Sequence, residues 1–251
     1  GVQTCALPIS PERINPGDQS HALSKVAKVV SGLDDKSLKF VSRLYEKIVP
    51  SIHEAESLEV AEASKLLENI QRDVNIALLN ELQFCFDEMG IPMDSVLKSA
   101  STKWNFNNYH PGLVGGHCVP VDPYYLIDEA RKFSANLPLI AQARKTNEEA
   151  VANFYRKILN KLKRPYASSY VLINGLSFKP EVPDIRNTQV PSLKSMLEQN
   201  GVKVDIYDPN VKPEVAKNSF GIELLKKLPV FDNYHLIVSP YDLSIKKGGR
   251  F

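Results

Sequence analysis

The spacing of apolar residues over the first ninety positions predicts a short α/β segment followed by one long helix. The apolar run from Val26 to Val30 predicts a strand, and Asp34 or Asp35 then caps a helix with apolar residues at three-to-four spacing. A short extended stretch follows at 51–55. From Leu58 to Met89 helical periodicity continues without Pro or Gly, which gives a rod of roughly 48 Å at about 1.5 Å per residue. We expect so long a helix to cross the molecule and to form an interface.

Most apolar residues of this helix are predicted to lie near one stripe, which we call the inner stripe. Its members recur at three-to-four spacing, and three leucines flank them. The stripe consists of Leu66, Ile70, Val74, Ala77, Glu81 and Cys85, with Leu67, Leu78 and Leu82 beside it.

The pattern becomes irregular after a further short helix at Met93 to Ala100. Residues 103–121 are rich in Asn, Gly, Pro, His and aromatic side chains, which predicts a loop with constrained turns. Asp122 and Pro123 then start a helix, with Asp122 as its cap. Another helix is expected over 139–162.

Beyond a polar boundary near 163–169 the period becomes that of an alternating α/β unit. Strands are predicted at Tyr170 to Ile173, Val202 to Tyr207 and Leu236 to Ser239, with a helix from Pro191 to Gln199 after the first. The fold class is therefore α/β, and its last part is the start of a doubly wound domain. Such domains bind ligands at the carboxyl ends of their strands.

Composition and charge exclude several classes of protein. The 251 residues are 43% hydrophobic and 24% charged, which indicates a folded chain with a sizeable core. A net charge of +2 lacks the basic field of a general nucleic-acid or membrane-surface binder. No run reaches the roughly 18 apolar residues of a bilayer span, so we expect a soluble, cytoplasmic protein. Three cysteines and dispersed histidines suggest neither a disulfide framework nor a metal site.

A cysteine close to a predicted helix start is the strongest candidate for chemistry. Gly115 and Gly116 allow close approach of the backbone to a ligand just ahead of Cys118, and the helix start at Asp122 follows four residues later. Partial positive charge at a helix N-terminus favours thiolate relative to the usual thiol pKa of about 8.5. Cys118 is thus a plausible nucleophile, whereas the alternative is a buried structural cysteine.

Three further polar residues carry weaker signals. Lys65 and Asn69 are spaced i and i+4, so they share one face of the long helix and can point at one site. Glu12 lies in a stiff loop that contains prolines. Each of the three also has an ordinary interpretation as a solvated surface residue.

The segment after the first strand of the last domain contains candidate nucleotide-binding residues. Lys179 and Arg186 supply cations suited to a diphosphate, and Phe178 could pack on a base or a sugar. The alternative is a solvated loop with a local pair between Asp184 and Arg186. No G-x-G-x-x-G fingerprint occurs anywhere in the chain.

In combination these motifs resemble the UDP-glucose/GDP-mannose dehydrogenase family, over about residues 10 to 243. The Lys103 to Cys118 stretch is similar to the family's UDP-N-acetylhexosamine 6-dehydrogenase branch. The motifs that carry the likeness are Ser10 to Gly17, Ala61 to Asn69 with Asn80 and Glu81, Gly115 to Asp122, Gly175 to Lys179, and Asp184 to Arg186.

The resemblance implies three domains and a fragment of a longer enzyme. Residues 10–56 would be the end of an N-terminal Rossmann domain that binds NAD, 57–164 a central long-helix domain for catalysis and dimerisation, and 165–251 a truncated Rossmann-like UDP-binding domain. Residues 1–9 have no periodicity and no charge, and we expect them to be non-native.

The resemblance also implies a mechanism in which a sugar C6 alcohol is oxidised to a carboxylate with NAD⁺. Cys118 would hold the substrate as a thiohemiacetal and then as a thioester. Lys65 would stabilise oxyanion charge, and Glu12 would act as acid and base. Asn69 and Asp122 would position the water and Lys65.

Substrate and cofactor contacts follow from the same likeness. Lys103, Tyr109 and Gly115 would contact the UDP-sugar, Phe178 and Lys179 its UDP part, and Arg186 the diphosphate of NAD. The implied product is a uronic acid for polysaccharide synthesis, and the implied partner is a second copy that pairs through the long helix.

Two other hypotheses remain open. In one, the chain binds a nucleotide sugar without turnover, because it lacks most of the cofactor domain. In the other, residues 57–163 serve only as a helical dimerisation module. Nicotinamide reduction by this chain alone is expected to be undetectable in either case.

Overall fold

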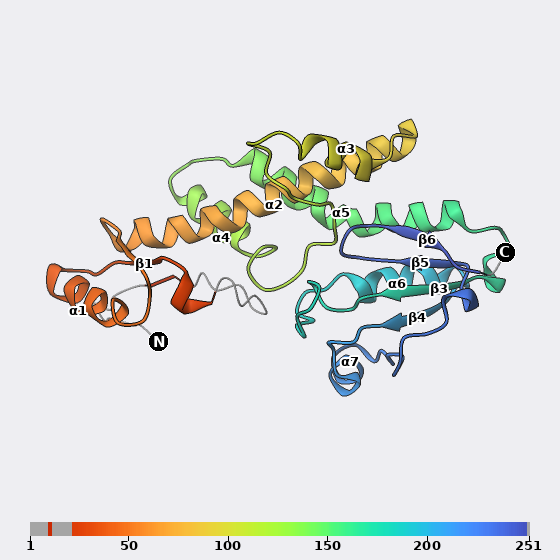
Figure 1. Ribbon diagram of the computed structural model, residues 1–251. Coiled ribbons are helices and arrows are strands. Elements are labelled where there is room, and N and C mark those ends of the chain that lie inside the picture. Colours follow the sequence, from red (N-terminus) through yellow and green to blue (C-terminus); the bar gives the residue numbers. More distant parts are fainter. Residues whose placement is uncertain (1–9, 12–21, 250–251) are drawn as a thin grey trace. The chain divides into compact units, whose positions relative to one another are not determined.

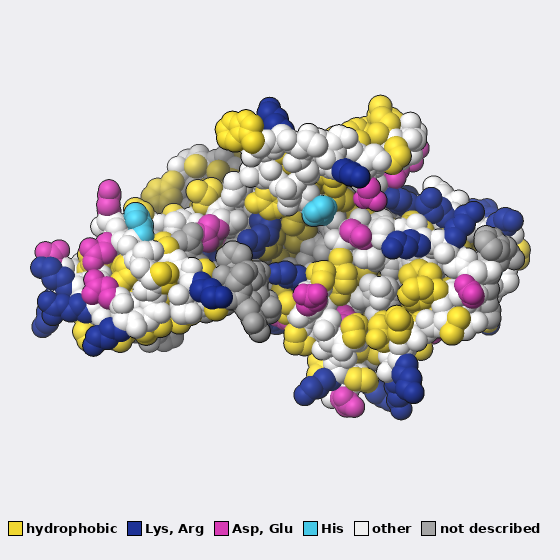
Figure 2. Space-filling model, in the orientation of Figure 1, with side chains coloured by type: hydrophobic (Ala, Val, Ile, Leu, Met, Phe, Trp, Pro, Cys, Tyr) yellow, Lys and Arg dark blue, Asp and Glu magenta, His cyan; other side chains and the backbone are white. Residues whose placement is uncertain are grey.

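The protein, in a computed structural model that describes residues 10–11 and 22–249, consists of two compact units (Figure 1). One unit runs to Asn69 and the other begins at Ile70. No helix among the described residues is both long enough and apolar enough to span a bilayer. Basic, acidic and apolar side chains are interspersed over the face that Figure 2 shows.

The first unit contains a parallel pair of strands and one amphipathic helix. Strand β1 (Lys28–Val30) pairs with β2 (Ile52–Glu54), and helix α1 (Asp35–Tyr45) connects them. Asp34 is the cap of α1, because its carboxylate accepts a 2.7 Å hydrogen bond from the Ser37 N–H. The predicted strands and the capped helix are confirmed.

Helix α2 (Leu58–Met89) has the predicted bounds, and its buried face matches the predicted stripe in part, since Ile70 and Ala77 are buried. The face carries polar side chains that are at most 6% exposed, namely Asn69, Asp73, Asn80 and Gln83. Glu81 and Cys85, which we expected on the inner stripe, are exposed, and so are Leu67 and Leu78. The polar members of the buried face were missed because hydrophobic periodicity assigns polar helical residues to solvent.

Three helices come next after α2 in the chain. They are α3 (Met93–Ala100), α4 (Asp122–Lys132) and α5 (Pro138–Lys161), and 101–121 forms the predicted loop between α3 and α4. Leu79 of α2 forms a small apolar cluster with Met93 and Leu97 of α3. The cluster fixes α3 against the middle of α2.

A four-stranded sheet of order β4-β3-β5-β6 forms the last part of the chain (Figure 1). Strands β4 and β5 run parallel to β3 on either side of it, and β6 is antiparallel to β5. The bounds are β3 (Tyr170–Asn174), α6 (Val190–Gln199), β4 (Lys203–Tyr207), α7 (Pro213–Phe220), β5 (Leu236–Val238) and β6 (Ile245–Lys247), with short 3₁₀ turns at Leu23–Lys25, Tyr166–Ser168 and Phe231–Asn233. The three parallel strands and α6 were predicted, whereas α7 and β6 were not.

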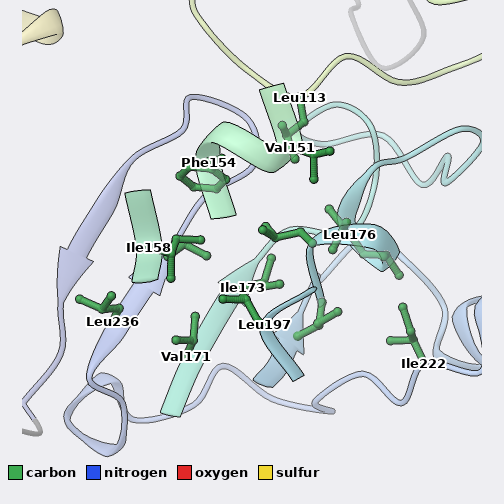
Figure 3. Packing of buried hydrophobic residues seen from close by; sticks show 14 of the residues in the cluster. Leu113, Val151, Phe154, Ile158, Val171, Ile173, Leu176, Leu197, Ile222 and Leu236 are labelled. Atoms are coloured by element: carbon green, nitrogen blue, oxygen red, sulfur yellow. The ribbon is translucent and has the colours of Figure 1, made fainter. Parts of the chain in front are cut away.

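The largest apolar core lies where α5 and α6 pack on this sheet. Phe154 and Ile158 of α5 and Val171 and Ile173 of β3 are wholly buried within it. Each such side chain contributes about 1.5–3 kcal/mol by leaving water. Figure 3 shows Leu113, from the loop before α4, beside Val151 in the same core. The loop that precedes Cys118 is therefore anchored in the core of the sheet.

Candidate active site

Cys118 lies half-buried in a turn that leads into α4. Its carbonyl accepts hydrogen bonds from the N–H groups of Val121 (3.0 Å) and Asp122 (2.8 Å). Asp122 is the first residue of the helix and Val121 holds the cap position, so the prediction that Asp122 is the cap was wrong. Pro123 lies in the first turn, where its missing N–H costs no hydrogen bond within the helix. The predicted proximity of Cys118 to a helix N-terminus is confirmed.

The two glycines before Cys118 leave room for Phe178, and their approach to a ligand stays a prediction. Gly116 has a φ of +85°, and a Cβ there would lie 3.1 Å from the Phe178 ring. A Cβ on Gly115 would lie 2.7 Å from the Phe178 Cβ and 3.0 Å from the Asn187 carbonyl oxygen. Both positions therefore require glycine.

Backbone hydrogen bonds join the cysteine loop to the loop that follows β3. The Gly116 N–H donates to the Arg186 carbonyl, and the Asn187 side-chain amide donates to the Gly116 carbonyl, both at 2.9 Å. The structure thus brings together three predicted site residues of two distant segments: Gly115, Cys118 and Phe178. They meet at the carboxyl end of a parallel strand, where α/β domains bind ligands.

Charged groups surround Cys118. Its Sγ lies 3.5 Å from His117 Nε2. The Arg186 guanidinium is 59% exposed and pairs with Asp184, with 3.0 Å from its Nε to each carboxylate oxygen. Asp184 raises the pKa of Arg186, and the Cys118 thiolate adds to this effect. Arg186 in turn lowers the pKa of Asp184. A thiolate or an anionic ligand at this place therefore faces a cation.

Asp208 anchors the loop that carries Phe178 and Lys179. Its Oδ2 accepts hydrogen bonds from the N–H groups of Leu176 (2.8 Å) and Ser177 (2.9 Å) and from the Ser177 hydroxyl (3.0 Å). Burial favours the neutral acid, but these hydrogen bonds outweigh it and lower the pKa of Asp208. Lys179 is half-buried at the end of this turn. Sequence reasoning missed Asp208, although its place directly after β4 was a usable signal.

The Tyr241 side chain contacts the same turn at Gly175 and Ser177. Its hydroxyl lies 2.7 Å from Ser177 Oγ, and burial raises the pKa of the phenol. Gly175 has a φ of +125°, and a Cβ there would lie 2.6 Å from the Tyr241 ring. Tyr241 was not among the predicted residues. Its role depends on a contact across the sheet that no local pattern indicates.

The remaining predicted residues lie on α2 or outside the described part. Lys65 is 29% exposed and 3.9 Å from Glu68, and Asn69 is 3% exposed. Both belong to the first unit, whereas Cys118 belongs to the second, so their meeting at one site stays a prediction. Glu12 lies outside the described residues.

The two predicted sugar-contacting residues lie in the loop after α3. Lys103 is exposed, and Tyr109 packs against the small cluster of Leu79, Met93 and Leu97. Their contact with a substrate stays a prediction. Within 10–11 and 22–249, no group of three or more His, Cys, Asp or Glu side chains could hold a metal ion.

Comparisons with known proteins agree with this geometry. The model of the UDP-glucose/GDP-mannose dehydrogenase family's central domain matches residues 59–149, and that of its UDP binding domain matches 172–242. A UDP-N-acetyl-D-glucosamine 6-dehydrogenase from Pseudomonas aeruginosa is 44% identical over 217 residues, which cover 85% of this chain and 51% of the relative.

Solved structures show the same fold. A UDP-D-ManNAc dehydrogenase from Pyrococcus horikoshii matches with a TM-score of 0.79 and 27% identity, over 93% of this chain and 54% of the other. The UDP-N-acetyl-mannosamine dehydrogenase Cap5O from Staphylococcus aureus matches with a TM-score of 0.73 and 30% identity, over 92% and 52%. The chain spans about half the length of each of these relatives.

Proposed function

Because the chain belongs to the UDP-glucose/GDP-mannose dehydrogenase family, we propose that it forms part of an NAD-dependent UDP-N-acetylhexosamine 6-dehydrogenase. The proposed reaction oxidises the C6 alcohol of the sugar to a carboxylate, for a polysaccharide precursor. The names of its relatives support an N-acetylated hexosamine as the sugar. We assign residues 57–164 to the central domain and 165–251 to UDP binding.

One observation carries the proposal: the loop of Cys118 is hydrogen-bonded to the loop that contains Phe178 and Arg186. Phe178 and Lys179 would bind the UDP part, since they follow the central strand of the α/β sheet. Lys103, Tyr109 and Gly115 would contact the sugar. A nucleotide held at this edge would extend its sugar toward the thiol.

Cys118 would act as a covalent nucleophile. Its thiolate adds to the C6 aldehyde and the resulting oxyanion takes a proton, which gives a thiohemiacetal. Loss of a hydride and of the hydroxyl proton leaves a thioester. Water then attacks the acyl carbon, the C–S bond breaks, and the products are the carboxylate, the thiolate and two protons. Holding C6 on sulfur prevents escape of the aldehyde.

The other catalytic roles need Lys65, Asn69, Asp122 and Glu12. Lys65 would stabilise the oxyanion, and Glu12 would transfer protons during hydrolysis. Asn69 and Asp122 would orient the water and Lys65. The backbone N–H of Asp122 donates to the Cys118 carbonyl, which supports its assignment to the same site.

Arg186 fits one requirement of NAD⁺. Its side chain is 59% exposed, and an exposed guanidinium can pair with a diphosphate. The printed 251 residues contain no glycine-rich dinucleotide fingerprint. Two NAD⁺ molecules, bound in turn, would each accept one of the two hydrides that leave C6. We expect these residues alone to bind UDP-sugar without reducing NAD⁺.

A second copy of the chain is the proposed protein partner. Val60, Leu67 and Leu78 are 47–66% exposed, and their spacing of seven and eleven residues places them on one stripe of α2. Pairing of two such stripes would cover these side chains. This supports dimerisation through the long helix.

The proposed function is tested by the rate at which iodoacetamide alkylates individual cysteines of the chain near pH 7.5. Cys118 should react faster than Cys85, an exposed thiol on α2 that serves as the internal control. Saturating UDP-N-acetylglucosamine should slow Cys118 alone. Equal rates, or no protection of Cys118, would refute the assignment.

A further inference from the structure

We propose that Asn80 of α2 is a positioning residue for Cys118, which acts through the backbone of the segment Gly112–Gly116. This inference rests on the proposed function, since it concerns the placement of the same nucleophile. The observation behind it is a chain of buried amide hydrogen bonds that begins at an ion pair in the helical part and ends at the cysteine loop.

Asn80 holds Gly112 at both of its backbone polar groups. The Asn80 Nδ2 donates to the Gly112 carbonyl at 3.0 Å, and the Asn80 Oδ1 accepts from the Gly112 N–H at 2.8 Å. Asn80 is 0% exposed. The Asn80 side-chain amide thus makes the two hydrogen bonds with Gly112 that a neighbouring β-strand would otherwise make. Both buried polar groups of the Gly112 backbone are therefore paired.

The orientation of the Asn80 amide is set by Asn147 and Asp73. Asn147 Nδ2 donates to the backbone and side-chain oxygens of Asp73, at 2.9 and 2.8 Å. Asn147 Oδ1 is therefore turned toward Asn80 and accepts from its Nδ2 at 2.9 Å. Only one amide orientation of Asn80 then presents a donor to Asn147 and Gly112 together.

A buried ion pair fixes the start of this chain. Asp73 is 0% exposed and Arg144 is 2% exposed, with 3.0 Å between Asp73 Oδ1 and an Arg144 guanidinium nitrogen. Reversing the Asn147 amide would direct its NH₂ group at Asn80 and its oxygen at the Asp73 carboxylate. The pair therefore acts as a fixed reference for the amides.

The rest of the segment is held from other elements. The Leu113 N–H donates to the Pro240 carbonyl at 2.9 Å, and Gln189 Nε2 donates to the Val114 carbonyl at 2.9 Å. With the bonds to Gly112 and Gly116 described above, four of the five positions from 112 to 116 are held by hydrogen bonds ahead of His117. The segment that leads to Cys118 is thus held by the side chains of Asn80, Gln189 and Asn187 and by backbone carbonyls of other elements.

The experiment uses the full chain and the same alkylation assay. The measured quantity is the protection factor of Cys118, which is its rate without UDP-N-acetylglucosamine divided by its rate with it. UDP binding is measured in parallel by calorimetry. The matched control is Asn75→Ala, because Asn75 lies on α2 and its side-chain amide donates to the Gln71 carbonyl of the same helix.

In Asn80→Asp we expect the protection factor near pH 8 to fall by about tenfold, because a carboxylate oxygen replaces the donor that faces Gly112 and Asn147. UDP affinity should stay unchanged. At about pH 5.5 a protonated carboxyl again offers one donor and one acceptor, so protection should return in part. The comparison is with wild type at the same pH, because Asp73 also takes up a proton near pH 6. A role in folding alone does not predict this recovery at acid pH.

Gln189→Met provides an independent variant of similar size that loses only the bond to Val114 and a longer one to Asn147. Its protection factor should also fall, without recovery at low pH. Wild-type protection in both variants overturns the inference, as does loss of UDP binding together with protection. Absence of protection in the wild-type chain overturns the proposed function instead, and the inference with it.

Discussion

Replacement of Asp73 by Asn tests the electrostatics of the buried face of α2. Asp73 is 0% exposed, and burial raises its pKa from 3.8 to about 6. The charge of Arg144 and the hydrogen bond from Asn147 act in the opposite direction but do not cancel the effect of burial. The Asp73→Asn variant keeps the shape of the side chain and removes its titration.

The sign of the pH effect follows from proton linkage. Between about pH 4 and pH 6 the folded chain holds a proton on Asp73 that the unfolded chain has lost. The free energy of unfolding therefore falls as pH rises through this window, and the full difference from 3.8 to about 6 corresponds to about 3 kcal/mol. Below about pH 4 the free energy of unfolding no longer depends on the titration of Asp73, and above about pH 6 the full loss has occurred.

The assay is urea unfolding of wild type and Asp73→Asn, followed by circular dichroism at pH 4.5 and 7.5. Between these values the wild type should lose about 2 kcal/mol relative to the variant, because part of the window lies below pH 4.5. Effects of the new amide that do not depend on pH cancel, because the change in stability between the two pH values is compared for each protein. If the wild type instead gains stability relative to the variant, attraction to Arg144 outweighs burial and the reasoning is refuted.

A control variant on the same helix is Asp87→Asn. Asp87 lies 2.7 Å from Lys157, and its side chain is 31% exposed. Such a surface pair contributes at most about 1 kcal/mol. The comparison separates a buried ion pair from a solvated one.

Three further predictions concern the glycine turn, the nucleotide loop and the dimer. Gly116→Ala should lower the free energy of unfolding by about 1–3 kcal/mol in a urea titration, because φ is +85° and Phe178 fills the space; an unchanged midpoint would contradict this. Asp208→Ala should lower it by at least about 2 kcal/mol and weaken UDP binding in calorimetry, because three hydrogen bonds to one carboxylate oxygen are lost; wild-type affinity would contradict the anchoring role. Leu67→Glu combined with Leu78→Glu should shift the chain from dimer to monomer in analytical ultracentrifugation, whereas a dimer that persists would exclude this stripe as the interface.

The elements predicted correctly from sequence are those with long, uniform patterns. Helix α2 and the three parallel strands follow from periodicity and from continuous apolar runs. Strand β6 was missed because Ile245–Lys247 has one apolar residue and two lysines, as suits an edge strand. Helix α7 was also missed, although Pro213 in its first turn and Gly221 at its end, with φ of +67°, were usable signals.

The residues of the candidate site also divide into those that a local sequence pattern marks and those that it does not. Cys118 and Phe178 were found because each lies in a distinctive local motif, and the structure brings their loops together. Asn80 was noted only as part of a resemblance, and Asp73 was not noted at all. A buried amide or carboxylate in a helix has no local mark that distinguishes it from a solvated one, because its partner lies far away in the sequence.

The polarity of the buried face of α2 has a physical cause in the loop that it contacts. Burying an amide without a partner costs free energy, and so does burying a backbone N–H or carbonyl. Gly112 is buried in a segment that belongs to no strand, and Asn80 satisfies both of its backbone polar groups from 32 residues earlier in the chain. A leucine at this position would fit the helical pattern better and would leave two backbone groups unsatisfied. At Asn80 the helix is therefore polar on this face because the loop needs a hydrogen-bonding partner there.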